Sequence, residues 1–356
     1  MSQKVLVAMS GGVDSAVAAL LLRENGYALE AATMMLQSSR YLENGAASCC
    51  NEQDILDARV VAERLGIPHR VFDFSDHFEE KVVRPFISDY LAGRTPNPCI
   101  NCNRHLKFDT LFLAAKALGC DKIATGHYAR VAYDEARGRY LLKKAKDLTK
   151  DQSYVLYSLS QSELSHILFP LGDMTKVEVR AIAEKEGLVN AKKRDSQDIC
   201  FVPDKNYVGF IERMTGKEIP IGEFVDTDGN PLGTHKGIIR YTVGQHKKLG
   251  LSTTEPLYVV RIAPDENKIT LGKEDALYSS VLTASSITLS AVDELKEPTR
   301  LLAKIRYRHT EAPATVTQID NNRVRVVFDT PQRAITPGQS LVLYDGDTVV
   351  GGGIIE

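Results

Sequence analysis

The sequence predicts an α/β domain built on a parallel sheet, followed by a small β-rich domain and a C-terminal β-barrel. Up to about residue 203, short β-branched runs alternate with longer helical patterns, which is the rhythm of βαβ units. After about residue 206 the pattern changes to short strands separated by turn residues. From about residue 279 the alternation of apolar and polar residues becomes clearer still. We therefore expect domains at residues 1–205, 206–278 and 279–356.

The first predicted domain carries strands and helices in alternation. Glycines follow the helical patterns at Gly66, Gly119 and Gly187, as is typical of helix ends. Such a series predicts a parallel sheet covered by helices. The expected strands are residues 5–8, 29–34, 69–72 and 122–124, and the expected helices are residues 13–25, 54–65, 77–91, 107–118 and 176–186.

Turn residues divide the rest of the chain into strands. In the middle domain, strands are expected at residues 238–243, 257–262 and 268–272, with turns at residues 228–231 and 264–265. In the last domain they are expected at residues 301–307, 315–319, 323–328 and 340–344, with hairpins at residues 321–322 and 345–346. Strand alternation would then place Arg306 and Arg308 on one face and Tyr307 on the other.

Composition excludes several classes of protein. The 356 residues are 43% hydrophobic and 25% charged, which is an ordinary globular mixture and far from that of disordered chains. The longest apolar runs fall well short of the roughly 18 residues that span a bilayer. The formal net charge of −2 lacks the basic excess of a protein that coats nucleic acid non-specifically. We expect a cytoplasmic protein with no membrane partner, whose contacts with any nucleic acid are made by local patches.

The strongest local signal is the segment Ser10–Ser15, which reads Ser-Gly-Gly-Val-Asp-Ser between a predicted strand and a predicted helix. Its two glycines allow the backbone to approach an anion, and the N-terminus of the helix offers unpaired N–H groups to a phosphate. The Walker and G-x-G-x-x-G patterns are absent, which disfavours γ-phosphate and hydride transfer. Asp14 could favour the helix dipole or help to hold Mg²⁺. The alternative is a glycine-rich turn without function.

This segment resembles the pyrophosphate loop of the ATP pyrophosphatase superfamily. The resemblance implies cleavage of ATP between the α and β phosphates and an adenylated substrate. Adenylation turns a carbonyl oxygen into a leaving group, so a nucleophile must then reach the carbon, and a thiolate or persulfide sulfur is a strong one.

Two cysteine segments could supply that nucleophile. Cys99 and Cys102 lie in one polar stretch, and Cys200 lies in another. Cys102 precedes the helix expected at residues 107–118, whose N-terminal end could lower its pKa. The basic residues 192–194 could do the same for Cys200. Six cysteines in so long a chain are too sparse for a disulfide framework, which leaves redox, metal and nucleophilic roles open.

Several segments together resemble the tRNA-specific 2-thiouridylases, and the match runs from end to end of the chain. They are Ser10–Ser15, residues 95–98 with Cys102 and Asn103, residues 124–128, 150–154, 199–201 and 244–250. The resemblance implies that Cys200 carries a persulfide delivered by a sulfur relay. It further implies that Cys102 completes transfer to C2 of the wobble uridine, ending in a disulfide with Cys200 unless reduced.

The resemblance also implies binding residues. Expected ATP contacts are Ala8, Met9, Ser10, Gly11, Gly12, Val13, Asp14, Ser15, Met34 and Gly126. Expected contacts with the target base are Asn97, Pro98 and Cys99, and expected contacts with the rest of the tRNA are His127, Lys150, Asp151, Gln152, Arg306, Tyr307 and Gln339. The implied partners are tRNA and a sulfur donor, which is a relay protein, a cysteine desulfurase or free sulfide. ATP and Mg²⁺ are the implied cofactors.

Cys99 departs from the family pattern, because many members have aspartate at this position. An aspartate could act as a general acid or base, and a thiol is a poorer proton shuttle. Cys99, Cys102 and Cys200 could instead bind three irons of a [4Fe-4S] cluster and leave the fourth open for sulfide. A persulfide site with a resolving thiol would show the same spacing, so both forms of sulfur delivery stay open.

Other residues support simpler expectations. Cys120 lies beside a predicted buried strand and is expected in the core, whereas Cys49 and Cys50 are expected in a surface loop. His127 follows a strand of the parallel sheet, at the edge where ligands bind, which favours a role in the site.

Two other functions would share part of this pattern. An amidating ligase such as a GMP or NAD synthetase also has a pyrophosphate loop but does not need Cys102 and Cys200. A thiol or iron-sulfur redox sensor would bind tRNA or nucleotide without ATP turnover, and the intact loop weighs against it.

Overall fold

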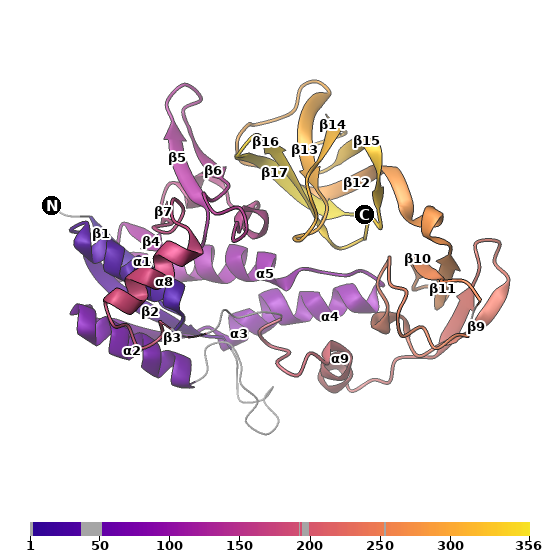
Figure 1. Ribbon diagram of the computed structural model, residues 1–356, viewed down its shortest axis with the longest axis horizontal. Helices are drawn as coiled ribbons and strands as arrows, with labels where there is room; N and C mark the ends of the chain where they lie inside the picture. The colour runs from indigo at the N-terminus through magenta and orange to yellow at the C-terminus, as the bar shows by residue number, and fades with distance from the viewer. Residues whose placement is uncertain (1–2, 37–51, 192, 194–198, 253) are drawn as a thin grey trace. The chain divides into compact units, whose positions relative to one another are not determined.

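The computed structural model describes residues 3–36, 52–191, 193, 199–252 and 254–356. Cys49 and Cys50, expected in a surface loop, lie outside these residues. The chain separates into two compact units (Figure 1). The first unit comprises Met1–Val83, Pro98–Lys205 and Asp347–Val349, and the second comprises Arg84–Asn97, Asn206–Gly346 and Val350–Glu356.

A parallel sheet forms the centre of the first unit, as predicted, but it has five strands, and the last of them, β7, was not expected. The strand order is β3-β2-β1-β4-β7, and Val5 of β1 lies opposite Leu29 of β2 and Lys122 of β4. The central strands β1 and β4 are buried on both faces, which needs short apolar runs, and the sequence supplies them there. The strands are β1 (Lys4–Ala8), β2 (Ala28–Met35), β3 (His69–Asp73), β4 (Lys122–Ala124) and β7 (Ile167–Leu168).

Three helices share one core with this sheet. They are α1 (Val13–Glu24), α2 (Glu52–Leu65) and α8 (Lys176–Lys185). Val17 of α1, Val61 of α2 and Val179 of α8 are buried with Val7 of β1 in this core. Thr175 caps α8 in a capping box with Glu178, which explains why the predicted start of this helix is confirmed.

Other helical segments of the first unit differ from the prediction. The helix expected at residues 77–91 is three successive segments, α3 (Ser75–Phe78), the π-helical η2 (Glu79–Val83) and, in the second unit, α4 (Arg84–Leu91). The helix expected at residues 107–118 begins earlier, with α5 (Pro98–Asn101), the π-helical η3 (Cys102–Thr110) and α6 (Leu111–Ala117). A proline suits the first helical position because it lacks an N–H and has a fixed φ. The predicted start at residue 107 was therefore wrong.

The remaining elements of the first unit are short. A hairpin joins β5 (Arg130–Asp134) to β6 (Arg139–Lys143), with Arg130 opposite Lys143. A 3-10 turn, η4 (Ser153–Leu156), and a capped helical turn, α7 (Gln161–Leu164), follow.

The second unit contains a small four-stranded sheet that follows α9 (Tyr207–Thr215), and its order is β10-β11-β8-β9. The expected turn at residues 228–231 is confirmed, since it joins β8 to β9, but the strand expected at residues 238–243 is wrong. Ile238–Arg240 forms the 3-10 turn η5 after Gly237, which has a φ of 103°. Ile238 and Ile239 are buried in this turn. A short apolar run that is needed for packing has the same sequence pattern as a strand, which explains the wrong prediction. The strands are β8 (Gly222–Val225), β9 (Pro231–His235), β10 (Tyr258–Ala263) and β11 (Lys268–Gly272).

A closed β-barrel ends the chain, as predicted. Six strands follow one another in the order β12-β15-β14-β13-β16-β17, and pairing of β12 with β17 closes the ring. Inward-facing residues such as Ala303, Val316 and Leu343 form its core. The strands are β12 (Tyr278–Leu289), β13 (Thr299–Lys304), β14 (Ala312–Gln318), β15 (Val324–Arg333), β16 (Ser340–Asp345) and β17 (Thr348–Ile355), and η6 (Glu274–Leu277) precedes them.

The strand expected at residues 301–307 ends early, at Lys304. Arg306, Tyr307 and Arg308 lie in a turn, in which the N–H of His309 donates to the carbonyl of Arg306 over 3.1 Å. The predicted alternation of the two arginines and Tyr307 on a strand was therefore wrong.

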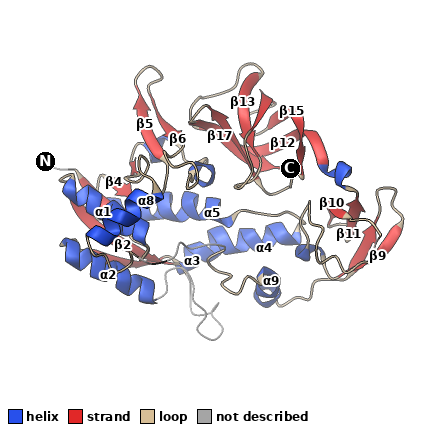
Figure 2. Ribbon diagram, in the orientation of Figure 1, coloured by secondary structure: helices blue, strands red, loops and turns tan. Residues whose placement is uncertain are grey.

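Figure 2 shows helices concentrated in the first part of the chain and strands in the last part. Within the described residues, no helix has the length and apolar character needed to cross a membrane.

Candidate nucleotide and thiol site

The segment Ser10–Ser15 joins the end of β1 to the start of α1. Gly12 is the N-cap of α1 and offers no side chain to the first N–H groups of the helix. The hydroxyl of Ser15 donates to the carbonyl of Gly12 over 3.0 Å and accepts from the N–H of Ser10 over 3.2 Å, which closes the loop. A helix start with uncapped N–H groups is suited to bind an anion such as a pyrophosphate.

Two glycines allow the backbone around this loop to pack closely. Gly11 has a φ of 72°, and a Cβ on it would lie 2.4 Å from the carbonyl oxygen of Asp54. A Cβ on Gly126, which follows β4, would lie 2.7 Å from the backbone nitrogen of Ser15. Because β1 and β4 are parallel neighbours, their carboxyl ends meet at one edge of the sheet. The structure thus brings together the loop and Gly126, which were both expected to contact ATP.

The other expected ATP contacts lie at the same edge. The N–H of Met9 donates to Ala32 over 2.7 Å, and the hydroxyl of Thr33 donates to the carbonyl of Met9 over 2.8 Å. Met34 follows in β2 and is buried. The end of β1 and the end of β2 are therefore held side by side next to the loop.

Asp14 makes an ion pair that the sequence did not reveal. Lys176 of α8 donates to both carboxylate oxygens of Asp14, over 2.7 and 2.8 Å, and the hydroxyl of Tyr128 donates to Oδ1 over 2.8 Å. Lys176 is buried, so the pair neutralises a charge that would be costly to bury alone. The carboxylate beside the loop is thus engaged by protein donors.

Asn190 and Lys193 also hold the loop, through its carbonyl groups. The amide of Asn190, which is 3% exposed, donates to the carbonyls of Gly11 and Gly12 over 3.3 and 3.0 Å. Lys193 Nζ donates to the same Gly11 carbonyl over 3.2 Å and to Asp54 and Asp57 over 2.6 Å each. Burial alone would lower the pKa of Lys193, but the hydrogen bonds and charges of the two aspartates outweigh it and raise the pKa.

The sequence alone did not reveal Lys176, Asn190 and Lys193 as residues of this site. Lys193 lies in a basic run that was connected only with Cys200, and no periodic pattern links it to carboxylates more than a hundred positions earlier. Such contacts depend on how α2 and α8 pack against α1, which the sequence pattern does not encode.

The first unit also carries the three cysteines that were expected to act. Cys99 is exposed, in α5, and Cys102 is partly exposed, at the start of η3. Cys200 is partly exposed, and the ring of the adjacent Phe201 packs against Phe78 of α3 at 5.6 Å. Because α3 also contacts η3, the chain at Cys200 is anchored in the neighbourhood of the Cys102 helix.

The surroundings of the cysteines differ from expectation in one respect. Because helical structure begins at Pro98, Cys102 does not precede a helix but follows a complete turn of one. Within the described part of the chain, no three cysteine, histidine or acidic side chains gather closely enough to hold a metal ion. Cys99, Cys102 and Cys200 therefore form no preassembled cluster site in this conformation. Cys120 is 4% exposed, which confirms its predicted place in the core.

His127 lies in an aromatic environment close to the loop. Its ring centroid is 5.8 Å from that of Phe108 and 5.9 Å from that of Phe169, and its Nδ1 lies 2.7 Å from the hydroxyl of Thr125. Burial, together with the charge of Lys107, holds the pKa of His127 well below its usual value. A neutral imidazole results. Its expected contact with tRNA stays a prediction.

The segment expected to contact tRNA at residues 150–152 forms a well-bonded turn. Asp151 accepts from the N–H of Ala145 over 2.9 Å and from the hydroxyl of Ser153 over 2.7 Å. Gln152 Oε1 accepts from the N–H of Tyr128 over 2.9 Å. These bonds fix the turn next to the residues that follow Gly126.

The remaining expected tRNA contacts, Asn97, Arg306, Tyr307 and Gln339, belong to the second unit. Tyr307 is 39% exposed, with the ammonium of Lys304 lying 6.0 Å from its ring centroid. Arg306 and Gln339 donate hydrogen bonds to other protein groups.

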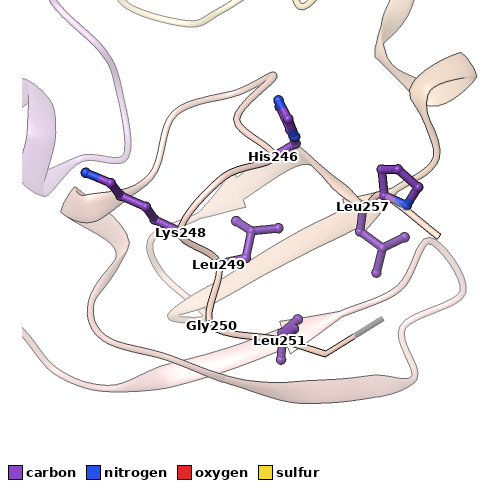
Figure 3. Close-up of a pocket in the computed structure, with 7 residues that line it drawn as sticks. His246, Lys248, Leu249, Gly250, Leu251 and Leu257 are labelled. Atoms are coloured by element: carbon purple, nitrogen blue, oxygen red, sulfur yellow. The ribbon is translucent and has the colours of Figure 1, made fainter. Parts of the chain in front are cut away.

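The segment Gly244–Gly250 is one of the segments that resemble the 2-thiouridylases. Part of it lines a cavity of about 200 Å³ in the second unit (Figure 3). Its walls come from this segment and from the residues that lead into β10. Polar side chains, His246 and Lys248, and apolar ones, three leucines and a proline, line it together.

Three family models match consecutive parts of the chain. The family described as "tRNA methyl transferase HUP domain" matches residues 3–204. The "tRNA methyl transferase PRC-barrel domain" matches residues 208–273, and the "Aminomethyltransferase beta-barrel domain" matches residues 279–355.

Full-length relatives are closely similar. A protein of Acetivibrio thermocellus named tRNA-specific 2-thiouridylase MnmA is 53% identical over 99% of both chains. A protein of Clostridioides difficile with the same name is 48% identical over 100% of this chain and 99% of its own. A solved 4-thiouridine synthetase–RNA complex with bound ATP is 19% identical, covers 60% of this chain and 50% of its own, and has a TM-score of 0.39, which is too low to add to the assignment. With half its residues shared along its whole length, the chain belongs to the tRNA-specific 2-thiouridylase family of tRNA-modifying enzymes.

Proposed function

We propose that this enzyme uses ATP to replace O2 of the wobble uridine of tRNA with sulfur. The observation that carries the proposal is the occurrence, in one compact unit, of a complete pyrophosphate loop and of Cys102 and Cys200. The names of the full-length relatives support the same reaction and substrate. In this proposal residues 1–205 bind ATP and carry the thiols, and residues 206–278 and 279–356 form two further domains.

The first step is adenylation of the uridine. O2 attacks the α-phosphorus of ATP, a new O–P bond forms, and the bond to the pyrophosphate breaks. The loop would hold the departing pyrophosphate through the N–H groups at the start of α1, where the helix dipole favours negative charge. The Asp14–Lys176 pair keeps the carboxylate from repelling the phosphates.

The second step transfers sulfur. The terminal sulfur of a Cys200 persulfide attacks C2, and AMP leaves with the former O2. The Cys102 thiolate then attacks Sγ of Cys200, so that the S–S bond to the uridine breaks and a Cys102–Cys200 disulfide forms. An external dithiol must supply two electrons to reduce this disulfide before the next turnover.

Among the residues that the structure describes, none forms a set of three magnesium ligands next to the loop. Both oxygens of Asp14 accept from Lys176, and the described residues contain no set of three ligands for a metal. The Mg²⁺ that accompanies ATP would therefore be held chiefly by phosphate oxygens, as is common for this ion.

A [4Fe-4S] cluster on Cys99, Cys102 and Cys200 is the alternative carrier of sulfur. Iron and acid-labile sulfide analysis after anaerobic purification separates the two forms. We expect an iron-free enzyme that is active only with a persulfide donor. Bound iron, with activity from free sulfide, would favour the cluster.

Binding of tRNA is proposed to depend on local basic residues, because the chain as a whole carries a net charge of −2. Each phosphate contact releases counterions, so the affinity for tRNA should fall as salt rises.

The function is tested by measuring pyrophosphate release from ATP with and without tRNA. We expect release that requires a tRNA with uridine at the wobble position, followed by AMP and 2-thiouridine in equal amounts. An amidating ligase would release pyrophosphate with a different acceptor, and a redox sensor would release none. Either outcome would contradict the proposal.

Replacing Asn190 with alanine should weaken ATP binding. The substitution removes two donors from the carbonyls of Gly11 and Gly12. Loss of buried hydrogen bonds of this kind costs about 1–3 kcal/mol, so the ATP concentration for half-maximal pyrophosphate release should rise roughly 5- to 150-fold. Asn25→Ala is the matched control, because Asn25 donates to the carbonyl of Leu21 at the far end of α1. An unchanged ATP dependence in Asn190→Ala would show that the loop does not need this support.

A further inference from the structure

Thr95 is held by two separate segments of the second unit, one around Thr242 and one at residues 337–339. Its N–H donates to the carbonyl of Pro337 over 2.9 Å, and its carbonyl accepts from Nε2 of Gln339 over 2.6 Å. Its hydroxyl lies 3.1 Å from that of Thr242. Backbone donor, backbone acceptor and side chain of one residue are thus all bonded to segments more than 140 positions away.

Gly338 allows this close approach. It has a φ of 87°, and a Cβ on it would lie 2.8 Å from Cβ of Arg94 and 2.9 Å from the nitrogen of Thr95. The loop between β15 and β16 can therefore lie against the backbone of Thr95 only because this position has no side chain.

Arg306 joins the two segments that contact Thr95. Its Nη2 donates to the carbonyl of Val243 over 3.0 Å, to the carbonyl of Ala334 over 2.8 Å and to the hydroxyl of Thr336. Val243 adjoins Thr242, and Thr336 adjoins Pro337, so one guanidinium fixes both sides of the Thr95 contact. The N–H groups of Nη2 are therefore engaged by protein acceptors.

The chain before Thr95 is fixed as well. The N–H of Arg94 donates to the carbonyl of Asp89 over 2.8 Å, and its guanidinium pairs with the carboxylate of Asp89 at 2.6 Å. Gly93 packs against Ile262, where a Cβ would lie 2.9 Å from Cγ2. The segment is therefore anchored from the end of α4 to Thr95.

The residues after Thr95 can transmit this constraint. They read Pro96-Asn97-Pro98, and a proline has a fixed φ and restricts the residue before it to extended conformations. Thr95 and Asn97 both precede prolines. Fixing Thr95 therefore limits the directions in which the chain can enter the segment Asn97–Cys99, which is expected to contact the target base.

We propose that Gln339 and Arg306 are positioning residues that hold Thr95 and thereby set the conformation of the base-binding segment Asn97–Cys99. The proposal deepens the proposed function and rests on it. It differs from a direct contact of Gln339 and Arg306 with tRNA, because their effect on the reaction passes through the backbone of Thr95.

Gln339→Glu tests the proposal with little change in side-chain volume, since it replaces the donor to the Thr95 carbonyl with an acceptor. We expect the single-turnover rate of thiolation at saturating tRNA to fall roughly 10- to 100-fold, the effect of losing one such bond. The dissociation constant for tRNA should change less than about twofold. In the free enzyme, hydrogen exchange of the peptide containing Thr95 should become faster.

Gly338→Ala should reproduce these effects by a different route, because its Cβ would push against Thr95. Gly229→Ala is the matched control: Gly229 has a φ of 88°, but nothing lies within 4 Å of a Cβ there. It shares the backbone strain without the collision and should leave the thiolation rate and the exchange near Thr95 unchanged.

Other results would overturn the proposal. Weaker tRNA binding in Gln339→Glu, with unchanged exchange at Thr95, would show a direct contact with tRNA. An unchanged thiolation rate despite faster exchange would show that the contact does not affect the base-binding segment. If the wild-type enzyme formed no 2-thiouridine, the proposed function would fail, whereas the exchange measurement would still report whether Gln339 holds Thr95.

Discussion

Cys200→Ser should form no thiolated tRNA and should still release one equivalent of pyrophosphate per active site. The serine cannot carry a persulfide, but the pyrophosphate loop and the residues that hold it are unchanged. Adenylated tRNA should therefore accumulate, and AMP should not appear. Loss of a nucleophile commonly costs more than about 10³-fold in rate, so thiolation should fall below detection. Rapid-quench measurement of pyrophosphate, with mass spectrometry of the tRNA, tests this result.

Cys102→Ser should stop the reaction one step later. The persulfide can still attack C2 and release AMP, but no thiolate is present to break the S–S bond to Cys200. We expect a covalent enzyme–tRNA adduct, visible on a denaturing gel, that releases 2-thiouridine-containing tRNA when dithiothreitol is added. An adduct with Cys200→Ser, or none with Cys102→Ser, would reverse or remove the assigned roles.

Two further cysteines serve as comparisons for these variants. Cys120 is buried in the core, so Cys120→Ala should retain thiolation. Cys99→Ser should also retain most of the activity if sulfur moves as a persulfide. Loss of activity together with loss of bound iron in Cys99→Ser would instead support a cluster.

Gly11→Ala should abolish ATP binding at millimolar concentrations. Its φ of 72° disfavours any residue with a Cβ, at a cost of roughly 1–2 kcal/mol. The new Cβ would also lie 2.4 Å from the carbonyl oxygen of Asp54, which is backbone and cannot rotate away. The loop must therefore move, and its N–H groups would lose their alignment with the phosphates. Calorimetric titration with ATP measures the effect.

Gly26→Ala separates the collision from the backbone strain. Gly26 follows α1 and has a φ of 78°, but nothing lies within 4 Å of a Cβ placed there. We expect this variant to lose about 1 kcal/mol of stability and to bind ATP normally. Equal losses of ATP binding in both variants would mean that general destabilisation, rather than the loop geometry, is responsible.

The parallel sheet could be predicted because its central strands, β1 and β4, are buried on both faces. Lys122–Ala124 and Lys4–Ala8 are short apolar runs followed by turn residues, and their predicted positions agree closely with the structure. The pyrophosphate loop could also be predicted from the sequence, because the glycines and hydroxyl groups that form it are adjacent in the chain. The barrel strands were recognisable because their residues alternate between the core and the surface.

Elements that lack such a pattern were missed. The π-helical segment Cys102–Thr110 is mostly polar, so its helical character leaves little periodic signal. Ile238 and Ile239 are buried in a 3-10 turn, and a short apolar run does not distinguish that turn from a strand. Arg306 lies just past the end of β13, where the predicted alternation no longer applies.

The partners of the site could not be predicted either, because they come from distant parts of the chain. Lys176 binds Asp14 across 162 positions, and Gln339 binds Thr95 across 244. These contacts depend on how helices and loops pack. The sequence around one residue of such a pair does not indicate the other residue. The sequence could indicate candidate residues for the chemistry, whereas the structure shows which residues pack around them.

The central claim is that ATP activates O2 of the wobble uridine and that sulfur then displaces it. The most direct test is mass spectrometry of the AMP formed with a tRNA that carries ¹⁸O at O2 of this uridine. We predict one ¹⁸O in AMP for each 2-thiouridine formed. Thiolation with unlabelled AMP would show that ATP activates a different group and would contradict the account.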